Sequence, residues 1–411
     1  MDHCLSLVRA ADRPIGTARY GHMFPSLDPL KIDSSALLRA GDVGGMCDAL
    51  TVEGDDATEA AGWPFFGQLI AHDITADRSP ISGGALRNAR APLLNLEILY
   101  ADGPIGSPFL FDVADPDRFL LAGSDVPRNQ QGVALIGDPR NDVHLISLAL
   151  HVALLRAHNR LGLSFEEARV QLTWHYQWVI VHDFLPRLVG PALVSSVLAE
   201  GGRWYAPALS EAFIPLEFAD AAYRYGHGQV RHSYRLVDGG PARPLFPDLA
   251  GFGPPAHRVD LAQLFDMPGR PPAQRAKRLD GRLAASLIGL PARVTGEVSE
   301  AAYRSLAVRD LVRGENTGLP SGEAVAALMG ETPVPSPAWP AGTPLWFYIL
   351  EEAAQLCDGN RLGPVGGRIV AEVLIGLLRA DPASYLTLEP DWQPTLPAAG
   401  PVFGLTDLLG D

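Results

Sequence analysis

The sequence predicts a single, mainly α-helical domain with long irregular loops. Its 411 residues are 47% hydrophobic and 19% charged, which is the composition of a globular protein with a sizeable core. Apolar side chains recur at helical spacing through most of the chain after residue 60, whereas the alternation typical of strands is rare. The 36 Pro and 42 Gly residues are spread along the chain and mark the turns between these segments.

This pattern divides the chain into an irregular N-terminal segment, residues 1–60, packed on the domain, and the domain itself, residues 61–411. The N-terminal segment contains the turn signals RPIG, FPSLDP and GDVGG. A first helix is predicted from Pro64, because proline suits the first helical position. A second is predicted over residues 144–161, with Gly162 as its stop.

Helical spacing continues through the second half of the chain. It predicts helices within the segments 165–190, 214–236, 297–322, 343–356 and 366–386. Pro- and Gly-rich connections, such as residues 236–254 and 330–342, separate them.

Charge and cysteine content exclude several classes of protein. The formal net charge is −14 and no Lys/Arg cluster appears, so nucleic acid and anionic membranes are poor partners. No apolar run reaches the roughly 18 residues of a membrane span. The N-terminus lacks the apolar core of a secretory signal, so we expect a cytoplasmic location. Cys4, Cys47 and Cys357 are widely spaced, which predicts free thiols. Nothing in the sequence indicates the oligomeric state.

The stretch WPFFGQLIAHDITAD, residues 63–77, places three polar side chains in an apolar helix. Gln68 and His72 are four residues apart and share one helix face. Asp73 lies roughly 100° further around the helix and points elsewhere. A lone histidine on such a helix is usually a hydrogen-bonded core residue, so this pair alone is a weak signal.

Arg140 lies in the turn GDPRND, just before the second predicted helix. Asn141 and Asp142 beside it are suitable N-cap residues. Such an arginine is usually a surface charge, but the start of the helix can also direct it into a pocket.

Two later segments carry further candidates. In AAYRYGHGQV, His227 has Arg224 one turn before it and the small Gly226 beside it, a suitable setting for an axial metal ligand. The ordinary alternative is a buried histidine with a surface arginine. In LAVRDLVRG, Asp310 lies three residues before Arg313. A ligating imidazole normally donates its other N–H to a carboxylate or carbonyl, but Asp310 can also pair with Arg309 or Arg313.

These segments resemble, in order, the signatures of the animal-type haem peroxidases of the peroxidase–cyclooxygenase superfamily: FFGQLIAHDIT, GDPRND…LH…LRAHNRL, FADAAYRYGHGQVR and LAVRDLVRGENTGLPSG. Two others resemble its short bacterial branch: QWVIVHDFLPRLVG and TPLWFYILEEA…RLGPVGGRIVAEVLIGLL. The resemblance extends from about residue 18 to the C-terminus. It implies a helical domain of this type, with long irregular loops around a buried b-type haem.

The resemblance also implies roles for individual residues on the distal side of the haem. His72 matches the distal histidine, which is the acid and base for peroxide. Gln68 lies beside it and orients water or a small anion. Arg140 matches the distal arginine.

On the proximal side, His227 matches the ligand of the haem iron. Arg224 and Arg313 match positions that meet the haem propionates. Asp310 matches the position that hydrogen-bonds the proximal histidine. The family mostly has Asn there, and a carboxylate at this position should lower the reduction potential of the iron.

The implied activity is that of a haem peroxidase, an oxidoreductase. It would cleave H2O2 heterolytically and oxidise a small organic donor or an easily oxidised anion. The alternatives are a haem-dependent oxygenase or dioxygenase of a lipid or other small molecule, and a non-enzymatic haem-binding protein. Fatty-acid oxygenases of the superfamily have a tyrosine three residues before the proximal histidine, where this chain has Arg224. Tyr223 and Tyr225 are predicted to be rotated about 100° away on a helix.

In the family, the Asp after the distal histidine binds Ca²⁺, so the resemblance implies that Asp73 could do so here. The ligand loop matches APLLNLEILY, in which the Leu93 carbonyl, Asn95 and Glu97 fall on ligand positions. All are the oxygen donors that Ca²⁺ requires. Ala91 replaces the usual Thr, and Asp73 could instead cap a helix or form a salt bridge.

Other departures concern the haem itself. Ala71 and Val143 stand where relatives have the Asp and Glu that esterify haem, so we predict non-covalent haem b without ester links. His144 stands where one relative has a Met joined to a haem vinyl, so chloride oxidation is not expected. We expect His144 to be a loop residue near the surface.

Overall fold

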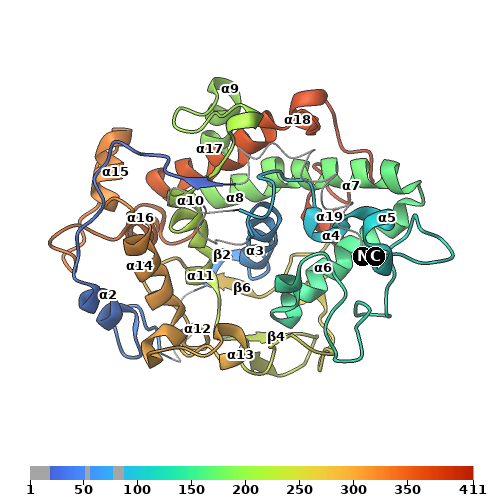
Figure 1. The fold of residues 1–411 in the computed structure, drawn as a ribbon, viewed down its shortest axis with the longest axis horizontal. Helices are drawn as coiled ribbons and strands as arrows, with labels where there is room; N and C mark the ends of the chain where they lie inside the picture. Colours follow the sequence, from blue (N-terminus) through green and yellow to red (C-terminus); the bar gives the residue numbers. More distant parts are fainter. Residues whose placement is uncertain (1–18, 51–55, 77–87, 411) are drawn as a thin grey trace.

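Helix α3 (Trp63–Ile74) lies in the middle of the protein, surrounded by the other long helices (Figure 1). The computed structural model describes residues 19–50, 56–76 and 88–410. Pro64 stands in the first turn of α3, as predicted, and almost all of the helix is buried. The side chains of α3 therefore face other protein elements in every direction.

Helix α6 (Leu145–Leu161) confirms the second predicted helix. His144 is its N-cap, because its Nδ1 accepts the N–H of Ser147 at 3.1 Å. Gly162 ends the helix in the left-handed region, with φ of 62°.

The next predicted helix, over 165–190, is nearly continuous in the structure. Helix α7 (Phe165–Val179) passes through one π-helical turn, η4 (Ile180–Phe184), into α8 (Leu185–Val189). The Ser164 hydroxyl and the Glu167 carboxylate form a capping box at its start.

The segment 214–236 contains the predicted helical structure, but not as one continuous helix. The segment forms α10 (Leu216–Ala219), a 3₁₀ turn η6 (Ala222–Arg224) and α11 (Gly226–Gln229), and then enters a strand. The break occurs at Ala221, whose φ and ψ of −133° and −78° are not helical. It brings α11 against α3, where Gly226 faces Pro64.

Two further groups of helices complete the body of the fold. Helix α14 (Leu306–Asn316) is capped by Ser305 and packs against α2 (Ser34–Gly41), beside α16 (Leu345–Cys357). Helix α17 (Pro364–Ala380) packs against α8, α9 (Pro191–Glu200) and α16. The remaining short helices are α4 (Glu97–Tyr100), α5 (Gly103–Gly106), α12 (Ala285–Ile288), α13 (Ala292–Thr295), α15 (Gly322–Met329), α18 (Tyr385–Leu388) and α19 (Leu405–Leu409).

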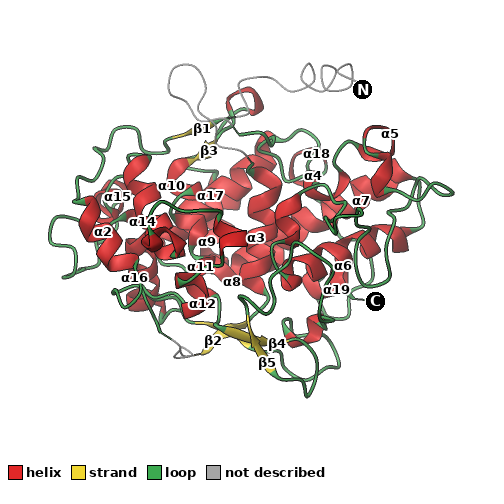
Figure 2. Ribbon diagram, turned by 60° about the horizontal axis from the view of Figure 1, so that its bottom comes forward, coloured by secondary structure: helices red, strands yellow, loops and turns green. Residues whose placement is uncertain are grey.

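Strands are short and form two-stranded pairs at the periphery (Figure 2). The parallel pair is β1 (Tyr20–Gly21) with β3 (Ile214–Pro215). The antiparallel pairs are β2 (Asp56–Ala60) with β6 (Arg275–Lys277), and β4 (Ser233–Arg235) with β5 (Ala242–Pro244). The mainly α-helical fold class is therefore confirmed.

The first 60 residues are less irregular than predicted, because their described part contains α2, β1 and β2. A domain boundary between residues 60 and 61 stays a prediction. Within the described residues, Cys47 and Cys357 are free thiols, while Cys4 lies outside them. Across the same described ranges, every helix is too short or too polar to cross a lipid bilayer.

Candidate active site

A cavity of about 360 Å³ lies between α3 and α11. Its volume falls in the range of roughly 300–1,000 Å³ that is typical of cofactor and small-molecule sites. His72 of α3 and His227 of α11 both line it. The apolar part of the wall includes Phe65, Phe218, Leu245, Leu287, Leu290 and Leu306. A larger hollow of about 960 Å³ beside α6 contains neither histidine, so we place the candidate site in the smaller cavity.

His72 is buried and held through its ring by Asn141. Its Nδ1 lies 2.7 Å from the Oδ1 of Asn141, and the Asn141 Nδ2 donates to the Nδ1 of His151 at 3.1 Å. Burial, together with the nearby charge of Arg140, lowers the pKa of His72 to about 4. His72 is therefore neutral at pH 7. Because Asn141 accepts at Oδ1, the ring proton sits on Nδ1 and the Nε2 is left as a proton acceptor.

Arg140 belongs to a 3₁₀ turn, η3 (Pro139–Asp142), and also lines the cavity. The cap of η3 is Asp138, which accepts the Arg140 backbone N–H at 2.9 Å. Asn141 and Asp142, which the sequence suggested as caps of the following helix, lie within η3, and the N-cap of α6 is His144. The Asp138 carboxylate also binds the Arg140 guanidinium, at 3.0 Å to Nε and 2.7 Å to Nη2. Burial raises the pKa of Asp138, but Arg140 outweighs burial and holds that pKa well below its usual value.

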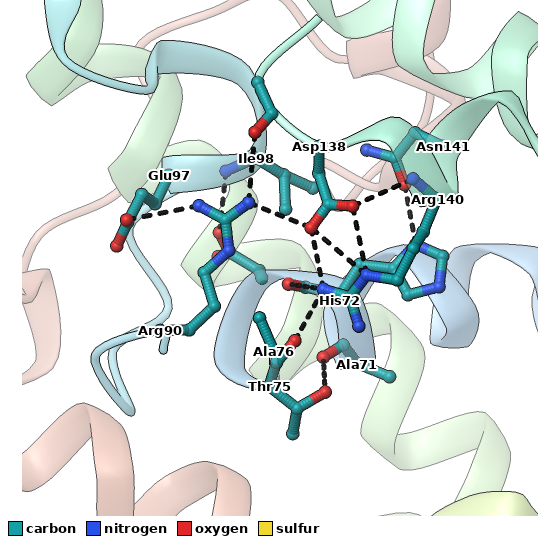
Figure 3. A network of polar contacts seen from close by, with 12 residues as sticks. Ala71, His72, Thr75, Ala76, Arg90, Glu97, Ile98, Asp138, Arg140 and Asn141 are labelled. Atoms are coloured by element: carbon teal, nitrogen blue, oxygen red, sulfur yellow. Dashed lines mark hydrogen bonds and ion pairs between the residues drawn. The ribbon is translucent and has the colours of Figure 1, made fainter. Parts of the chain in front are cut away.

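The Arg140 guanidinium is also tied to the end of α3 (Figure 3). Its Nη2 donates to the carbonyl oxygens of His72, at 3.0 Å, and Thr75, at 2.5 Å. Its Nη1 makes no hydrogen bond to the part of the chain that the structure describes. The arginine is thus held rigidly with one nitrogen left for a ligand.

Gln68 and His144 lie side by side in the lining of the cavity. The His144 Nε2 lies 3.1 Å from the Gln68 Oε1, and the Ser147 hydroxyl donates to the same oxygen at 3.3 Å. The expected surface position of His144 is wrong, because its exposed fraction is 3% and it lines the cavity. As the N-cap of α6 it turns its ring inward, which spacing along the chain could not show.

His227, the second histidine that lines the cavity, is bound to a buried carboxylate. The His227 Nδ1 lies 2.5 Å from the Asp310 Oδ2, and Asp310 is fully buried. Burial raises the pKa of Asp310, but His227, Arg224 and Arg313 outweigh burial and leave that pKa below its usual value. Asp310 is therefore a carboxylate that accepts the Nδ1–H of His227, which leaves the Nε2 of His227 for a ligand.

Arg224 and Arg313 lie beside this carboxylate. Their Nη1 atoms are 3.6 Å and 3.4 Å from the Asp310 Oδ1, and both side chains also approach the buried Asp220. Arg224 lines the cavity, whereas Arg313 is not among its lining residues. Asp310 thus has both partners that the sequence left as alternatives, the histidine and an arginine.

Tyr223 and Tyr225 correct one expectation. Both line the cavity, although an uninterrupted helix would have rotated them away. The 3₁₀ geometry of η6 and the break before α11 change their directions. Tyr225 passes close to α3, where its hydroxyl would be 2.9 Å from a Cβ at Gly67.

The expected Ca²⁺ ligands are arranged differently from a cation site. Asp73 is fully buried and accepts the backbone N–H groups of Leu96, at 2.9 Å, and Ile98, at 3.4 Å. Burial raises the pKa of Asp73 to about 7. The Asn95 Oδ1 accepts the N–H of Glu97, and the Glu97 carboxylate pairs with Arg90.

The lining fits a haem. A flat apolar ring matches the apolar part of the wall. Of the two histidines in the lining, His227 could bind an iron through Nε2, because Asp310 accepts its Nδ1–H, and His72 is uncharged. Arg224 also lines the cavity and could supply a cation for a propionate. Ala71 and Val143 line the same cavity and carry no group that could esterify the ring.

Sequence reasoning missed the bond of Asp138 to Arg140, and it missed that Asn141 joins His72 to His151. Asp138 stands two residues before Arg140 in the same motif, so an Asp followed by Pro and Arg was an available signal for a cap. Nothing in the sequence distinguishes His151 from an ordinary core residue, and only the fold shows its contact with Asn141.

Comparisons with known proteins relate the sequence and the fold to a family. The family model of the animal haem peroxidases matches residues 84–317, which is more than half of the chain. Among curated relatives, the chorion peroxidase of Aedes aegypti is 33% identical over 118 residues, 25% of this chain and 15% of that protein. Peroxidase mlt-7 of Caenorhabditis elegans is 29% identical over 115 residues, 25% of this chain and 16% of that protein. The chain spans less than a fifth of the length of the curated relatives it matches.

Solved structures show the same fold. Peroxidase A of Dictyostelium discoideum aligns with a TM-score of 0.63 at 15% identity, over 93% of this chain and 92% of that one. A fatty acid alpha-dioxygenase of Oryza sativa aligns with a TM-score of 0.59 at 13% identity, over 84% and 72% of the two chains. At these identities the likeness concerns the fold alone. The match of the family model, over more than half of the sequence, shows that the chain belongs to the animal haem peroxidase family of oxidoreductases.

Proposed function

We propose that the protein is a haem peroxidase that cleaves H2O2 heterolytically and oxidises a small organic donor or an easily oxidised anion. The observation that carries this proposal is the arrangement of one cavity. A neutral His72 and an anchored Arg140 line it together with His227, whose ring is bound to the buried Asp310.

The haem would be b-type and non-covalent. His227 would bind the iron through Nε2, the apolar wall would cover the ring, and Arg224 would pair with a propionate, with Arg313 behind it. When bound, haem supplies the iron that coordinates peroxide and passes on its oxidising equivalents. Because Ala71 and Val143 offer no carboxylate, the cofactor is held by coordination, ion pairing and burial only.

His72 is the proposed acid and base. It is neutral at pH 7 and keeps its own proton on Nδ1, so its Nε2 can accept a proton from H2O2 and return it to the departing oxygen. A positioned group that transfers a proton in this way contributes roughly 10²–10⁴-fold to a rate. Asn141 and His151 keep the ring in the required tautomer.

Arg140 is the proposed stabiliser of the charge that develops as the O–O bond breaks. Its bonds to Asp138 and to the end of α3 fix the guanidinium before peroxide arrives, so little reorganisation is needed. Gln68, bonded to His144, would orient water or a small anion next to His72.

Asp310 is the proposed regulator of the proximal ligand. A carboxylate accepting the Nδ1–H of His227 gives the ring imidazolate character and makes it a stronger electron donor to a metal. This favours the heterolytic cleavage of peroxide.

The test compares three haem-loaded proteins, namely the parent and the variants His72→Ala and His227→Ala. The parent should show a Soret band that changes rapidly when H2O2 is added. His72→Ala should keep the band and react 10²–10⁴-fold more slowly, because the proton acceptor is lost. His227→Ala should lose or loosen the haem. If His72→Ala reacted as fast as the parent, the role of His72 would be wrong, and a haem-loaded parent inert to peroxide would favour a non-enzymatic haem-binding protein.

A haem-dependent oxygenase is a second candidate, favoured by Tyr223 and Tyr225, which line the cavity and could form a radical there. The structural relatives include fatty acid alpha-dioxygenases, so a fatty acid is the substrate to try first. Oxygen uptake by the haem-loaded protein with palmitate, abolished in Tyr225→Phe or Tyr223→Phe, would support this candidate. Peroxide-dependent donor oxidation without oxygen uptake would support the peroxidase.

A further inference from the structure

The residues around Asp73 do not fit the Ca²⁺ that the family resemblance implies. A hard cation needs oxygen donors directed at it, but two backbone N–H groups, of Leu96 and Ile98, are directed at the Asp73 carboxylate. Asn95 uses its side-chain oxygen within its own loop. Within residues 19–50, 56–76 and 88–410, His, Cys, Asp and Glu form no group of three or more that could hold a metal ion.

A permanent cation, Arg90, lies in this region instead. The Arg90 Nη1 is 3.2 Å from the Glu97 Oε1, and its Nη2 is 2.9 Å from the Asp138 Oδ2 and 3.1 Å from the Gly137 carbonyl oxygen. The Arg90 side chain is only 10% exposed. Burial lowers the pKa of Arg90, but Glu97 and Asp138 more than offset this, so the guanidinium stays charged.

Arg90 reaches the distal pocket through Asp138 (Figure 3). The Asp138 carboxylate lies between two guanidinium groups and accepts from both Arg90 and Arg140. Arg140 in turn holds the carbonyl oxygen of His72 at 3.0 Å. A continuous chain of polar contacts therefore runs from Glu97, the first residue of α4, through Arg90, Asp138 and Arg140 to the end of α3.

We infer that Arg90 takes the place of the calcium ion: it ties the loop before α4 to η3 and the end of α3, and it positions Arg140 for peroxide. An ion can dissociate or be chelated, whereas a side chain cannot. The distal pocket of this chain should therefore form without Ca²⁺. The replacement of Ca²⁺ by Arg90 stands whether or not the protein is a peroxidase, whereas the positioning of Arg140 for peroxide rests on the proposed function.

The first experiment follows thermal unfolding of the full chain, with and without haem, in millimolar CaCl2 and in EGTA. The unfolding midpoint should be the same in both, because the region already contains its cation. A midpoint that rises with CaCl2 or falls with EGTA would overturn the replacement of Ca²⁺ by Arg90. This result does not depend on any activity.

The second experiment removes the guanidinium in Arg90→Ala. Asp138 then lacks its bond to Arg90 and fixes the Arg140 guanidinium less well. We therefore expect the reaction of the haem-loaded protein with H2O2 to slow by about 10–100-fold, the size of effect that a small misplacement of a catalytic group has. The rate of donor oxidation after the peroxide step should not change. Millimolar guanidinium chloride should restore much of the peroxide rate, since the free ion can occupy the vacated position.

The matched control is Arg368→Ala. Arg368 pairs with the buried Glu372 at 3.2 Å, and this ion pair shares no residue with the Arg90 chain. The control should lose stability without slowing the peroxide step, and guanidinium should not change its rate. An Arg90→Ala protein that reacted with H2O2 at the parental rate would show that Arg90 is an ordinary buried ion pair.

Arg90→Lys keeps the proposal testable if Arg90→Ala does not fold. Lysine retains the charge but cannot bind Glu97 and Asp138 with a planar fork. The variant should fold, keep its haem and react with H2O2 more slowly than the parent, and a parental rate would again contradict the positioning role. If the parent itself does not react with H2O2, the proposed function fails while the calcium result still stands.

Discussion

The Nδ1 of His227 lies 2.5 Å from the Oδ2 of Asp310, a carboxylate with no exposed surface. Two guanidinium groups, of Arg224 and Arg313, lie on the other oxygen of the same carboxylate. These cations keep Asp310 ionised in spite of its burial, so the histidine faces a full negative charge and not a neutral acceptor.

Asp310→Asn should raise the reduction potential of the haem iron. The amide can still accept the hydrogen bond from His227 but carries no charge, so the imidazole loses its imidazolate character. We expect a rise of about 60 mV, which corresponds to a tenfold change in a one-electron equilibrium. A spectroelectrochemical titration of the haem-loaded protein measures it.

Asp220→Asn is the control for that titration. It removes a buried carboxylate from the same group of charges, close to Arg224 and Arg313, without touching the hydrogen bond to His227. Equal shifts in the two variants would mean that total charge, and not the His227–Asp310 bond, sets the potential.

Asn141→Asp should raise the pH below which the reaction with H2O2 slows, which we call its acidic limit. The pKa of His72 is lowered to about 4, so the parent should lose its proton acceptor only as the pH falls toward 4. A carboxylate in place of the Asn141 amide oxygen, 2.7 Å from the ring, stabilises the protonated imidazole and raises the pKa of His72. Stopped-flow rates with H2O2 between pH 3.5 and 7 measure this limit. An unchanged limit would show that Asn141 does not influence the protonation of His72.

Acid should destabilise the haem-free protein between about pH 6.5 and 4. Burial lowers the pKa values of His72 and His151 to about 4 and of His144 to about 3. In that window the unfolded chain binds more protons than the folded one, so the free energy of unfolding falls as the pH falls. Each ring adds a slope of up to about 1.4 kcal/mol per pH unit. Asp73, with its pKa raised to about 7, contributes in the opposite direction.

Urea unfolding at pH 7 and pH 5 checks this dependence. His151→Gln should make it shallower, because one buried ring with a lowered pKa is gone. His257→Gln, at a partly buried position outside the cavity, is the matched control. A parent whose free energy of unfolding is the same at both pH values would contradict the burial of neutral histidines.

Haem should be fully extractable. Ala71 and Val143 line the cavity without offering an ester-forming carboxylate, so acidified butanone should remove the porphyrin and leave a colourless protein. Mass spectrometry of that protein should give the mass of the polypeptide alone. A residual absorbance that stays with the protein, or an added porphyrin mass, would reveal a covalent link.

Local signals predicted the elements that carry the distal side. Pro64 lies in the first turn of α3 and Gly162 ends α6, because both residues impose their backbone geometry without help from the rest of the fold. The break at Ala221 is different. It accompanies the packing of α11 on α3, a contact between distant parts of the chain that helical spacing over 214–236 could not reveal.

The same distinction applies to the site. The histidines at 72 and 227 could be proposed from motifs, and they do line one cavity. The contacts of His144 with Gln68 and of Arg90 with Asp138 join residues 48 or more positions apart, and no pattern within a short stretch of sequence reports such contacts.

The span between His227 and its carboxylate has a consequence for how the protein is made. Asp310 is 83 residues after His227. At synthesis rates of roughly 5–20 residues per second, a ribosome needs about 4–17 s to reach Asp310 once His227 has been added. A nascent chain therefore displays the imidazole that we propose as the iron ligand for seconds before its partner exists. If His227 has that role, stable capture of haem would wait until most of the polypeptide has been translated.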